Sequence, residues 1–263
     1  MLRSALAMSE TKRDQIRAYY HALFSAWGRQ HWWPAQSRFE VIVGAYLTQN
    51  TAWTNVEKAL VNLRKARLLS IKGIRGTSQP RLEKLIRSAG YFRQKAQRLK
   101  TFVSFLDASY CGSLSRMFAR PTAELRHELL ALNGVGPETA DSILLYAGNH
   151  PVFVVDAYTR RILERHQIVA SAASYDEIRG LFEQALAAEG TANVASEAGS
   201  VKTQPGPPGS CHRPSRVSKA ARPAPVQAFN EMHGLIVGVG KTYCLKSPRC
   251  EQCPLQKFLP QAK

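Results

Sequence analysis

The chain has 263 residues, with 36 lysines and arginines against 19 aspartates and glutamates, so its formal net charge is +17. This excess favours nucleic acid, a polyanion, as the partner, over a membrane surface or a merely solvated basic face. No apolar run is long enough for a membrane helix, and the N-terminal segment has too short an apolar core for a secretory signal. We therefore expect a cytoplasmic protein.

The first predicted element is a helix over residues 11–27, because apolar residues recur there at helical spacing. The segment Gln30-His31-Trp32-Trp33-Pro34 follows, and its proline ends any helix. Tryptophans in such a place either anchor the core or offer a flat surface for stacking. The sequence leaves both interpretations open.

Two helices are predicted over residues 39–63, separated by the polar stretch Thr48-Gln49-Asn50-Thr51 and followed by Trp53. By composition alone this stretch is simply a loop. Residues 81–100 then carry seven basic residues against one acid, Glu83. Most of these side chains are expected on a solvated helix face, and some are expected to meet phosphates.

Residues 124–166 contain two helical patterns around Leu132-Asn133-Gly134-Val135-Gly136. Two glycines one residue apart allow a tight turn, which brings backbone N–H groups to the start of the second helix. Such a start binds phosphate. An apolar run over residues 152–155 then leads to Asp156 at the head of another helix. An aspartate there is a favoured N-cap, and because a helix start also keeps a carboxylate ionised, capping is compatible with catalysis.

The C-terminal part begins with a predicted helix over residues 175–188. Residues 189–225 are rich in Ala, Ser, Gly and Pro, which predicts a disordered insert, and order is expected to resume with a helix at 229–237. The tail carries Cys244, Cys250 and Cys253 with the spacing C-x5-C-x2-C, a strong signal for clustered thiolate ligands rather than disulfides. Cys111 is expected to be an ordinary buried or half-buried thiol.

The hairpin L-x-G-V-G, followed about twenty residues later by an apolar run ending in V-D, resembles the helix-hairpin-helix DNA glycosylases of the endonuclease III superfamily. The resemblance implies an all-α, two-lobed fold. Residues 37–146 would form one domain containing the hairpin, and residues 1–36 and 147–263 the other. The implied partner is double-stranded DNA with damaged bases, bound by a monomer in a groove between the lobes.

The same resemblance assigns roles to individual residues. Asp156 would be the catalytic carboxylate. Gln49 would enter the gap that a flipped nucleotide leaves, with Asn50 beside it on the DNA. The residues that would hold the DNA backbone are those of the hairpin: Gly134, Val135 and Gly136.

Three motifs resemble one branch of the family more closely, the bacterial 3-methyladenine glycosylases of endonuclease III type. They are W-W-P, L-T-Q-N-T, and an aromatic twenty residues after the second tryptophan. In that branch the aromatics, here Trp32, Trp33 and Trp53, sandwich an alkylated purine. An alkylated purine is cationic, so stacking on an electron-rich ring gains about 0.5 to 2 kcal/mol.

The cysteine tail resembles the iron-sulfur loop of endonuclease III, in which four cysteines hold a [4Fe-4S] cluster. The fourth cysteine, expected near Leu259, is missing. The alternatives are a cluster completed by Cys211 from the insert, a three-cysteine cluster with an outside ligand, zinc, or a loop that folds without metal.

A second departure concerns the reaction. Bifunctional members carry a lysine two residues after the second hairpin glycine, where this chain has Glu138. A carboxylate cannot form an imine, which leaves a monofunctional glycosylase in which Asp156 stabilises the oxocarbenium-like sugar and directs a water.

Three rival functions remain. One is a bifunctional glycosylase and abasic-site lyase for oxidised pyrimidines, which would need Lys241 or Lys95 as its amine. Another is an adenine mismatch glycosylase, which is disfavoured because the chain has no room for the extra recognition domain. The third is a non-enzymatic DNA-binding module, since helix-hairpin-helix turns also serve that purpose.

Overall fold

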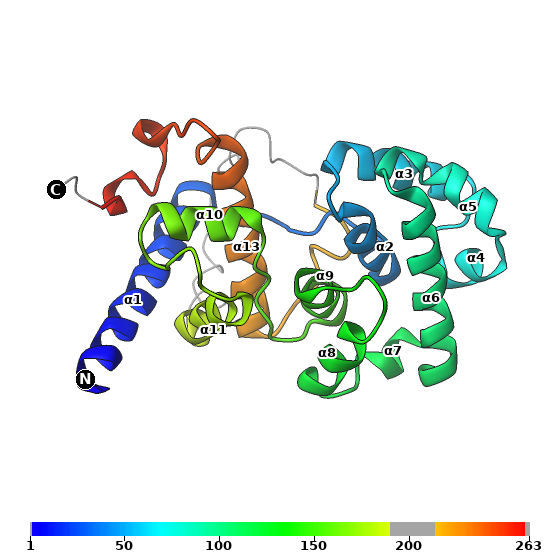
Figure 1. Cartoon of the computed structure of the whole chain (residues 1–263), viewed down its shortest axis with the longest axis horizontal. Helices are drawn as coiled ribbons and strands as arrows, with labels where there is room; N and C mark the ends of the chain where they lie inside the picture. The colour runs from blue at the N-terminus through cyan, green and yellow to red at the C-terminus, as the bar shows by residue number, and fades with distance from the viewer. Residues whose placement is uncertain (1, 190–213, 261–263) are drawn as a thin grey trace. The chain divides into compact units, whose positions relative to one another are not determined.

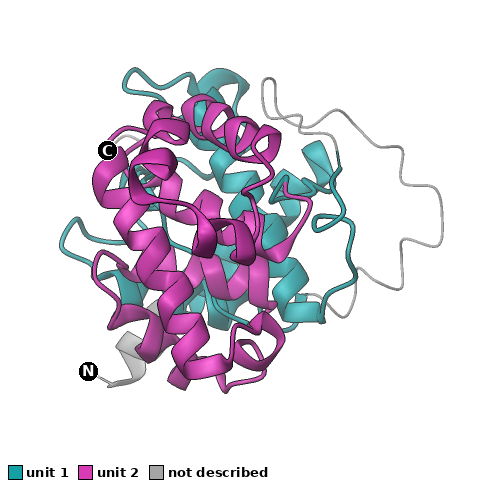
Figure 2. Cartoon of the chain, turned by 90° about the vertical axis from the view of Figure 1, so that its right-hand side faces the viewer, with its two compact units in different colours: residues 1–34, 151–263 teal, residues 35–150 magenta. Residues whose placement is uncertain are grey.

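The computed structural model describes residues 2–189 and 214–260, and every regular element in these ranges is a helix (Figure 1). The predicted all-α class is confirmed. The chain divides into two compact units, unit 1 with residues 1–34 and 151–263, and unit 2 with residues 35–150 (Figure 2). The division predicted at 37–146 places its boundaries two and four residues away from these. No described helix is long and apolar enough to cross a bilayer.

Unit 2 is built around a buried helix, α2. Every side chain from Phe39 to Leu47 is buried, and a helix that is apolar on all sides belongs in a core. It packs against α3, α6, α9 and η2. The elements of unit 2 are α2 (Arg38–Thr48), α3 (Trp53–Lys65), α4 (Ile71–Gly76), α5 (Gln79–Leu85), η1 (Arg87–Ala89), α6 (Phe92–Tyr110), α7 (Leu114–Met117), α8 (Thr122–Leu130), α9 (Pro137–Ser142) and η2 (Ile143–Gly148).

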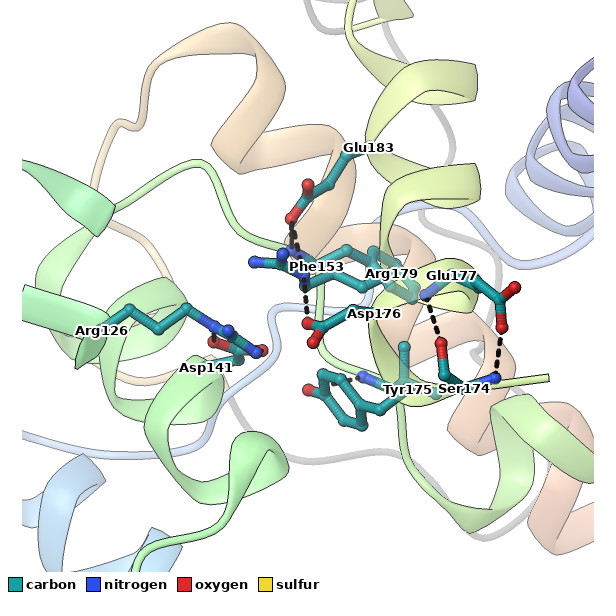
Figure 3. Close-up of polar contacts among 10 residues, drawn as sticks. Arg126, Asp141, Phe153, Ser174, Tyr175, Asp176, Glu177, Arg179 and Glu183 are labelled. Atoms are coloured by element: carbon teal, nitrogen blue, oxygen red, sulfur yellow. Dashed lines mark hydrogen bonds and ion pairs between the residues drawn. The ribbon is translucent and has the colours of Figure 1, made fainter. Parts of the chain in front are cut away.

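The predicted hairpin lies between α8 and α9, and an ion pair joins these two helices. The Arg126 guanidinium donates to both oxygens of Asp141 at 2.7 and 3.1 Å (Figure 3). The Asp141 side chain is fully buried and that of Arg126 is 15% exposed. The pair therefore fixes the two helices in a low-dielectric setting, where an unpaired charge would be costly.

Unit 1 has its own central helix, α13, in which every residue from Ala228 to Gly240 is buried. It packs against α1, α10 and α11. The elements of unit 1 are α1 (Leu2–Trp27), α10 (Ala157–Arg165), α11 (Tyr175–Leu186), α13 (Ala224–Thr242), η3 (Cys250–Gln252) and η4 (Gln256–Phe258).

Two predictions about the chain need correction. The insert expected at 189–225 is too long at its C-terminal end, since Ser215 and Ser218 are buried and α13 already begins at Ala224. The prolines of this segment suggested a disordered linker, but Pro223 and Pro225 lie at the start of α13, where a helix tolerates proline. Cys111, expected to be buried or half-buried, is exposed, because it ends α6 in a left-handed conformation with φ 52°. Residues 190–213 lie outside the described part of the chain.

Candidate active site

An extended segment in unit 1, residues 152–155, carries Asp156 to the start of α10, and α11 holds this segment from the side. The Phe153 N–H donates to Glu183 Oε1 at 3.0 Å (Figure 3), and the Val155 N–H donates to the Tyr175 hydroxyl at 3.3 Å. The Phe153 ring also stacks on Phe182 with centroids 4.1 Å apart. These contacts fix the backbone that precedes Asp156.

Asp156 is the N-cap of α10, as predicted. Its Oδ1 accepts hydrogen bonds from the Thr159 N–H at 2.7 Å and the Thr159 hydroxyl at 2.8 Å. The side chain is only 12% exposed. Burial raises the pKa of Asp156, but the attraction of His233 and the Thr159 donors outweigh burial, so that its pKa lies below the ordinary value. The carboxylate is thus buried and ionised at neutral pH.

Trp32 and Trp33 also belong to unit 1, and both are buried, with 8% and 6% of their surface exposed. Their rings meet edge-to-face at 5.9 Å. The Lys241 ammonium lies over the Trp32 ring, 5.7 Å from its centroid. The Ser215 hydroxyl, from the segment that precedes α13, donates to the Trp33 carbonyl at 3.4 Å.

In unit 2, the polar stretch after α2 forms a tight turn. Asn50 is exposed and adopts a left-handed conformation with φ 51°, which asparagine tolerates. Lys95 lies beneath the turn and is 1% exposed. Its ammonium donates to the Leu47 carbonyl at 2.8 Å, and to the Thr51 hydroxyl and the Ala89 carbonyl at 2.7 Å each. All three donors are therefore engaged, although burial lowers the pKa of Lys95 to about 8.

Gln49 connects this turn to the hairpin. Its amide nitrogen donates to the Gly134 carbonyl and to the Thr139 hydroxyl, both at 2.9 Å. Its amide oxygen accepts from Arg98 Nη1 at 2.7 Å. The structure thus brings Gln49 and the hairpin together through contacts among side chains and backbone of unit 2.

The three hairpin residues differ in their surroundings. Gly134 has φ 77°, and a Cβ there would overlap the Arg98 side chain. The Val135 side chain is 6% exposed and its N–H donates to the Leu132 carbonyl at 3.1 Å. A Cβ on Gly136 would meet nothing within 4 Å. Gly136 therefore borders open space, while Gly134 and Val135 form the turn itself.

Trp53, the third aromatic residue proposed for the base pocket, and Glu138, which stands in place of the lysine, both lie in unit 2. Trp53 is the first residue of α3, is partly exposed, and its indole N–H donates to Glu57 at 2.8 Å. Glu138 is exposed in the first turn of α9, where a carboxylate stabilises the helix start.

The three cysteines of the tail follow α13 in unit 1. Cys244 is buried, and Cys250 and Cys253 are half-buried. Arg165 Nη1 donates to Cys244 Sγ at 3.2 Å and to the Leu245 carbonyl at 2.6 Å, and Arg161 donates to the Cys244 carbonyl at 2.5 Å.

Within residues 2–189 and 214–260, no three or more His, Cys, Asp or Glu side chains are grouped so as to hold a metal ion. Burial raises the pKa of Cys253, and the neighbouring Cys250 and Cys244 raise it further. Cys211 lies outside the described residues. No step of the chemistry below is assigned to a metal or cluster.

The sequence did not indicate two further groups. His233 of α13 lies 3.7 Å from Asp156, measured from Nε2 to Oδ2. Arg98 of α6 was only one of seven basic residues, yet it holds Gln49. A histidine in an otherwise apolar stretch is a weak signal for His233, and no local pattern links it to a residue 77 positions earlier.

The chain matches known proteins over nearly its whole length. The family model described as "HhH-GPD superfamily base excision DNA repair protein" matches residues 43–188. A putative DNA repair glycosylase of Methanocaldococcus jannaschii is 39% identical over 253 residues, which is 95% of this chain and 98% of that one.

Two solved structures agree with this match. The H. pylori 3-methyladenine DNA glycosylase MagIII, bound to 1,N6-ethenoadenine, superposes with a TM-score of 0.66 at 26% identity, over 88% of this chain and 97% of that one. A trapped endonuclease III–DNA covalent intermediate gives a TM-score of 0.64 at 21% identity, over 94% of both chains, and shows the shared fold.

Proposed function

Because the chain belongs to the HhH-GPD superfamily of base excision DNA repair proteins, we propose that it is a monofunctional DNA glycosylase that releases alkylated purines. That it is a DNA glycosylase follows from the family. The substrate class and the absence of a lyase step are the proposal. We further propose that the chain acts as a monomer on double-stranded DNA.

The proposal rests mainly on the burial and the ionised form of the Asp156 carboxylate. Cleavage of an N-glycosidic bond leaves positive charge on the sugar, and a buried anion stabilises that charge far better than an exposed one. Thr159 fixes Oδ1 of Asp156, and burial keeps the carboxylate from bulk water. Asp156 can therefore stabilise the oxocarbenium-like sugar and direct the attacking water.

The available amines support a monofunctional reaction. A lyase step needs a neutral amine that can reach the sugar C1′. The place of the usual lysine is taken by Glu138. Lys95 is buried with its three N–H donors engaged, and the Lys241 ammonium lies against the Trp32 ring. Lys95 is therefore not presented as a nucleophile, and Lys241 is the remaining amine that borohydride trapping tests.

An alkylated purine is supported by the aromatic residues. Alkylation at N3 or N7 makes the base cationic, and Trp32 and Trp33 of unit 1 are rings proposed to stack on it. Trp32 already lies under the ammonium of Lys241, which is the same kind of attraction. The likeness to the H. pylori protein, which is a 3-methyladenine DNA glycosylase, supports the same substrate class.

A panel of duplex oligonucleotides tests the proposal. Each duplex carries an N7-methylated guanine, an oxidised pyrimidine, uracil or an abasic site, and each is treated with alkali and, separately, with borohydride. The expected result is strand breakage at the methylated guanine only after alkali, without a trapped adduct. A borohydride-trapped protein–DNA adduct would contradict the monofunctional reaction, and preferred release of an oxidised pyrimidine would contradict the substrate class.

A further inference from the structure

One turn of α13, Glu231 to Gly234, contacts both the tryptophan segment and Asp156 within unit 1. Glu231 is buried, and its Oε2 accepts from the Gln30 N–H at 2.6 Å. A Cβ on Gly234 would lie 3.0 Å from the Gln30 side chain and 3.1 Å from Trp32 Cβ. The glycine thus allows the segment that carries Trp32 to approach α13 closely.

His233 is the member of this turn that reaches Asp156. It is 5% exposed. Its ring lies edge-on to Trp32 at 6.4 Å and to Phe153 at 6.3 Å. Its Nε2 lies 3.7 Å from Oδ2 of Asp156. One side chain therefore contacts the candidate carboxylate, the segment that precedes it, and a ring of the candidate base pocket.

The two oxygens of Asp156 have different partners. Oδ1 accepts both Thr159 donors, whereas Oδ2 faces the imidazole. The neighbouring charged and titratable groups have other partners. Glu183 of α11 accepts the Phe153 N–H, and the Tyr175 hydroxyl of α11 accepts the Val155 N–H. Glu231 accepts the Gln30 N–H. In the described structure, His233 and Thr159 are the groups that favour the ionised form of Asp156.

We propose that His233 is a positioning residue for the glycosylase reaction, which orients Oδ2 of Asp156, keeps the carboxylate ionised, and couples it to the Trp32 wall of the base pocket. This inference rests on the function proposed above. Burial alone would raise the pKa of Asp156, and the attraction of the His233 imidazole, whose Nε2 lies 3.7 Å from Oδ2, helps to lower it. Without His233, burial would dominate and Asp156 would take up a proton at a higher pH.

The pH dependence of single-turnover base release distinguishes this role from a purely structural one. His233→Phe keeps an aromatic ring against Trp32 and Phe153 but carries no charge, and His233→Gln keeps an N–H donor without a charge. We expect the acid limb of the rate profile to move up by about one pH unit or more in both variants, with DNA affinity unchanged. The substrate is the duplex with N7-methylated guanine, and Asp156→Asn gives the background of spontaneous depurination.

A matched control is His166→Phe. His166 lies in the same unit and contacts Tyr19, with 2.6 Å between Nδ1 and the hydroxyl, away from Asp156. The acid limb of the pH–rate profile of His166→Phe should coincide with that of the parent protein. If the acid limb of the pH–rate profile were the same in the parent protein and in a folded His233 variant, the inference about His233 would be overturned. The proposed function would still stand, provided that Asp156→Asn releases no base above background. Full base release by Asp156→Asn, or none by the parent, would overturn both.

Discussion

Gly134 and Gly136 stand one residue apart, but a methyl group would act differently at each. At Gly134 the backbone is left-handed, with φ 77°, and the space beside it is filled by Arg98, which holds Gln49. At Gly136 the backbone has φ −92° and the space is open. The first glycine is thus required by the protein itself, and the second leaves room for something outside it, which we take to be a DNA phosphate.

Gly134→Ala and Gly136→Ala should therefore separate stability from binding. Gly134→Ala should lower the free energy of unfolding by about 1 to 2 kcal/mol, the cost of a left-handed alanine. Gly136→Ala should change stability little and weaken DNA binding by about tenfold, or 1.4 kcal/mol, because the methyl would separate backbone and phosphate. Thermal unfolding and fluorescence anisotropy measure the two effects. Equal DNA affinity of Gly136→Ala and the parent would contradict the phosphate assignment.

The hairpin also depends on a contact between helices, the ion pair of Arg126 on α8 with Asp141 on α9. Removing one partner leaves a mostly buried charge without its counterion. Asp141→Asn should therefore lower the free energy of unfolding by about 3 kcal/mol.

A matched control in the same unit is Asp107→Asn. The Arg75–Asp107 pair is exposed, with 47% and 36% of the side-chain surfaces accessible, so its loss should shift the unfolding midpoint much less. Chemical denaturation of both variants provides the comparison. If the two variants lost the same stability, the Arg126–Asp141 pair would not be what holds α8 to α9.

The cysteine loop after α13 is held by α10. The guanidinium groups of Arg161 and Arg165 donate to the carbonyls of residues 240 and 244–246 and to the Cys244 sulfur. Because the fourth cysteine expected near Leu259 is absent and no three His, Cys, Asp or Glu side chains of the described residues are grouped to hold a metal ion, we predict a loop that folds without a cluster.

Purified protein should therefore be colourless, and a chelator should leave its melting temperature unchanged, since a ligand that is not bound adds no stability. Arg165→Met should instead increase hydrogen exchange in residues 244–258. The prediction fails if the protein binds iron stoichiometrically, absorbs visible light and loses stability on chelation.

At the scale of the whole molecule, the sequence predicted the features that depend on local periodicity and on short motifs. The helices around the hairpin and the N-cap at Asp156 follow from apolar spacing and from residue preferences at helix ends, whereas the all-α class was implied by the family resemblance. The approach of Gln49 to Gly134 was not predicted, because 85 residues separate the two and no local pattern links them.

What the sequence could not predict are long-range contacts in the two cores. Each unit surrounds one fully buried helix, α2 or α13, and periodicity does not show which polar side chain of such a helix meets which distant group. His233 of α13 is of this kind, and the buried Lys95 of α6 likewise meets groups that are distant in the sequence. The C-terminal limit of the insert was wrong because a proline-containing segment at the start of a helix has the same composition as a proline-containing linker.

The most direct test of the account is single-turnover base release from a duplex with N7-methylated guanine by the parent and by Asp156→Asn. Asparagine is also a good N-cap, so α10 should stay folded and DNA affinity should be kept. We predict that the rate falls by about a hundredfold or more, as when a group that stabilises transition-state charge is removed. An Asp156→Asn variant that releases the base as fast as the parent would contradict it.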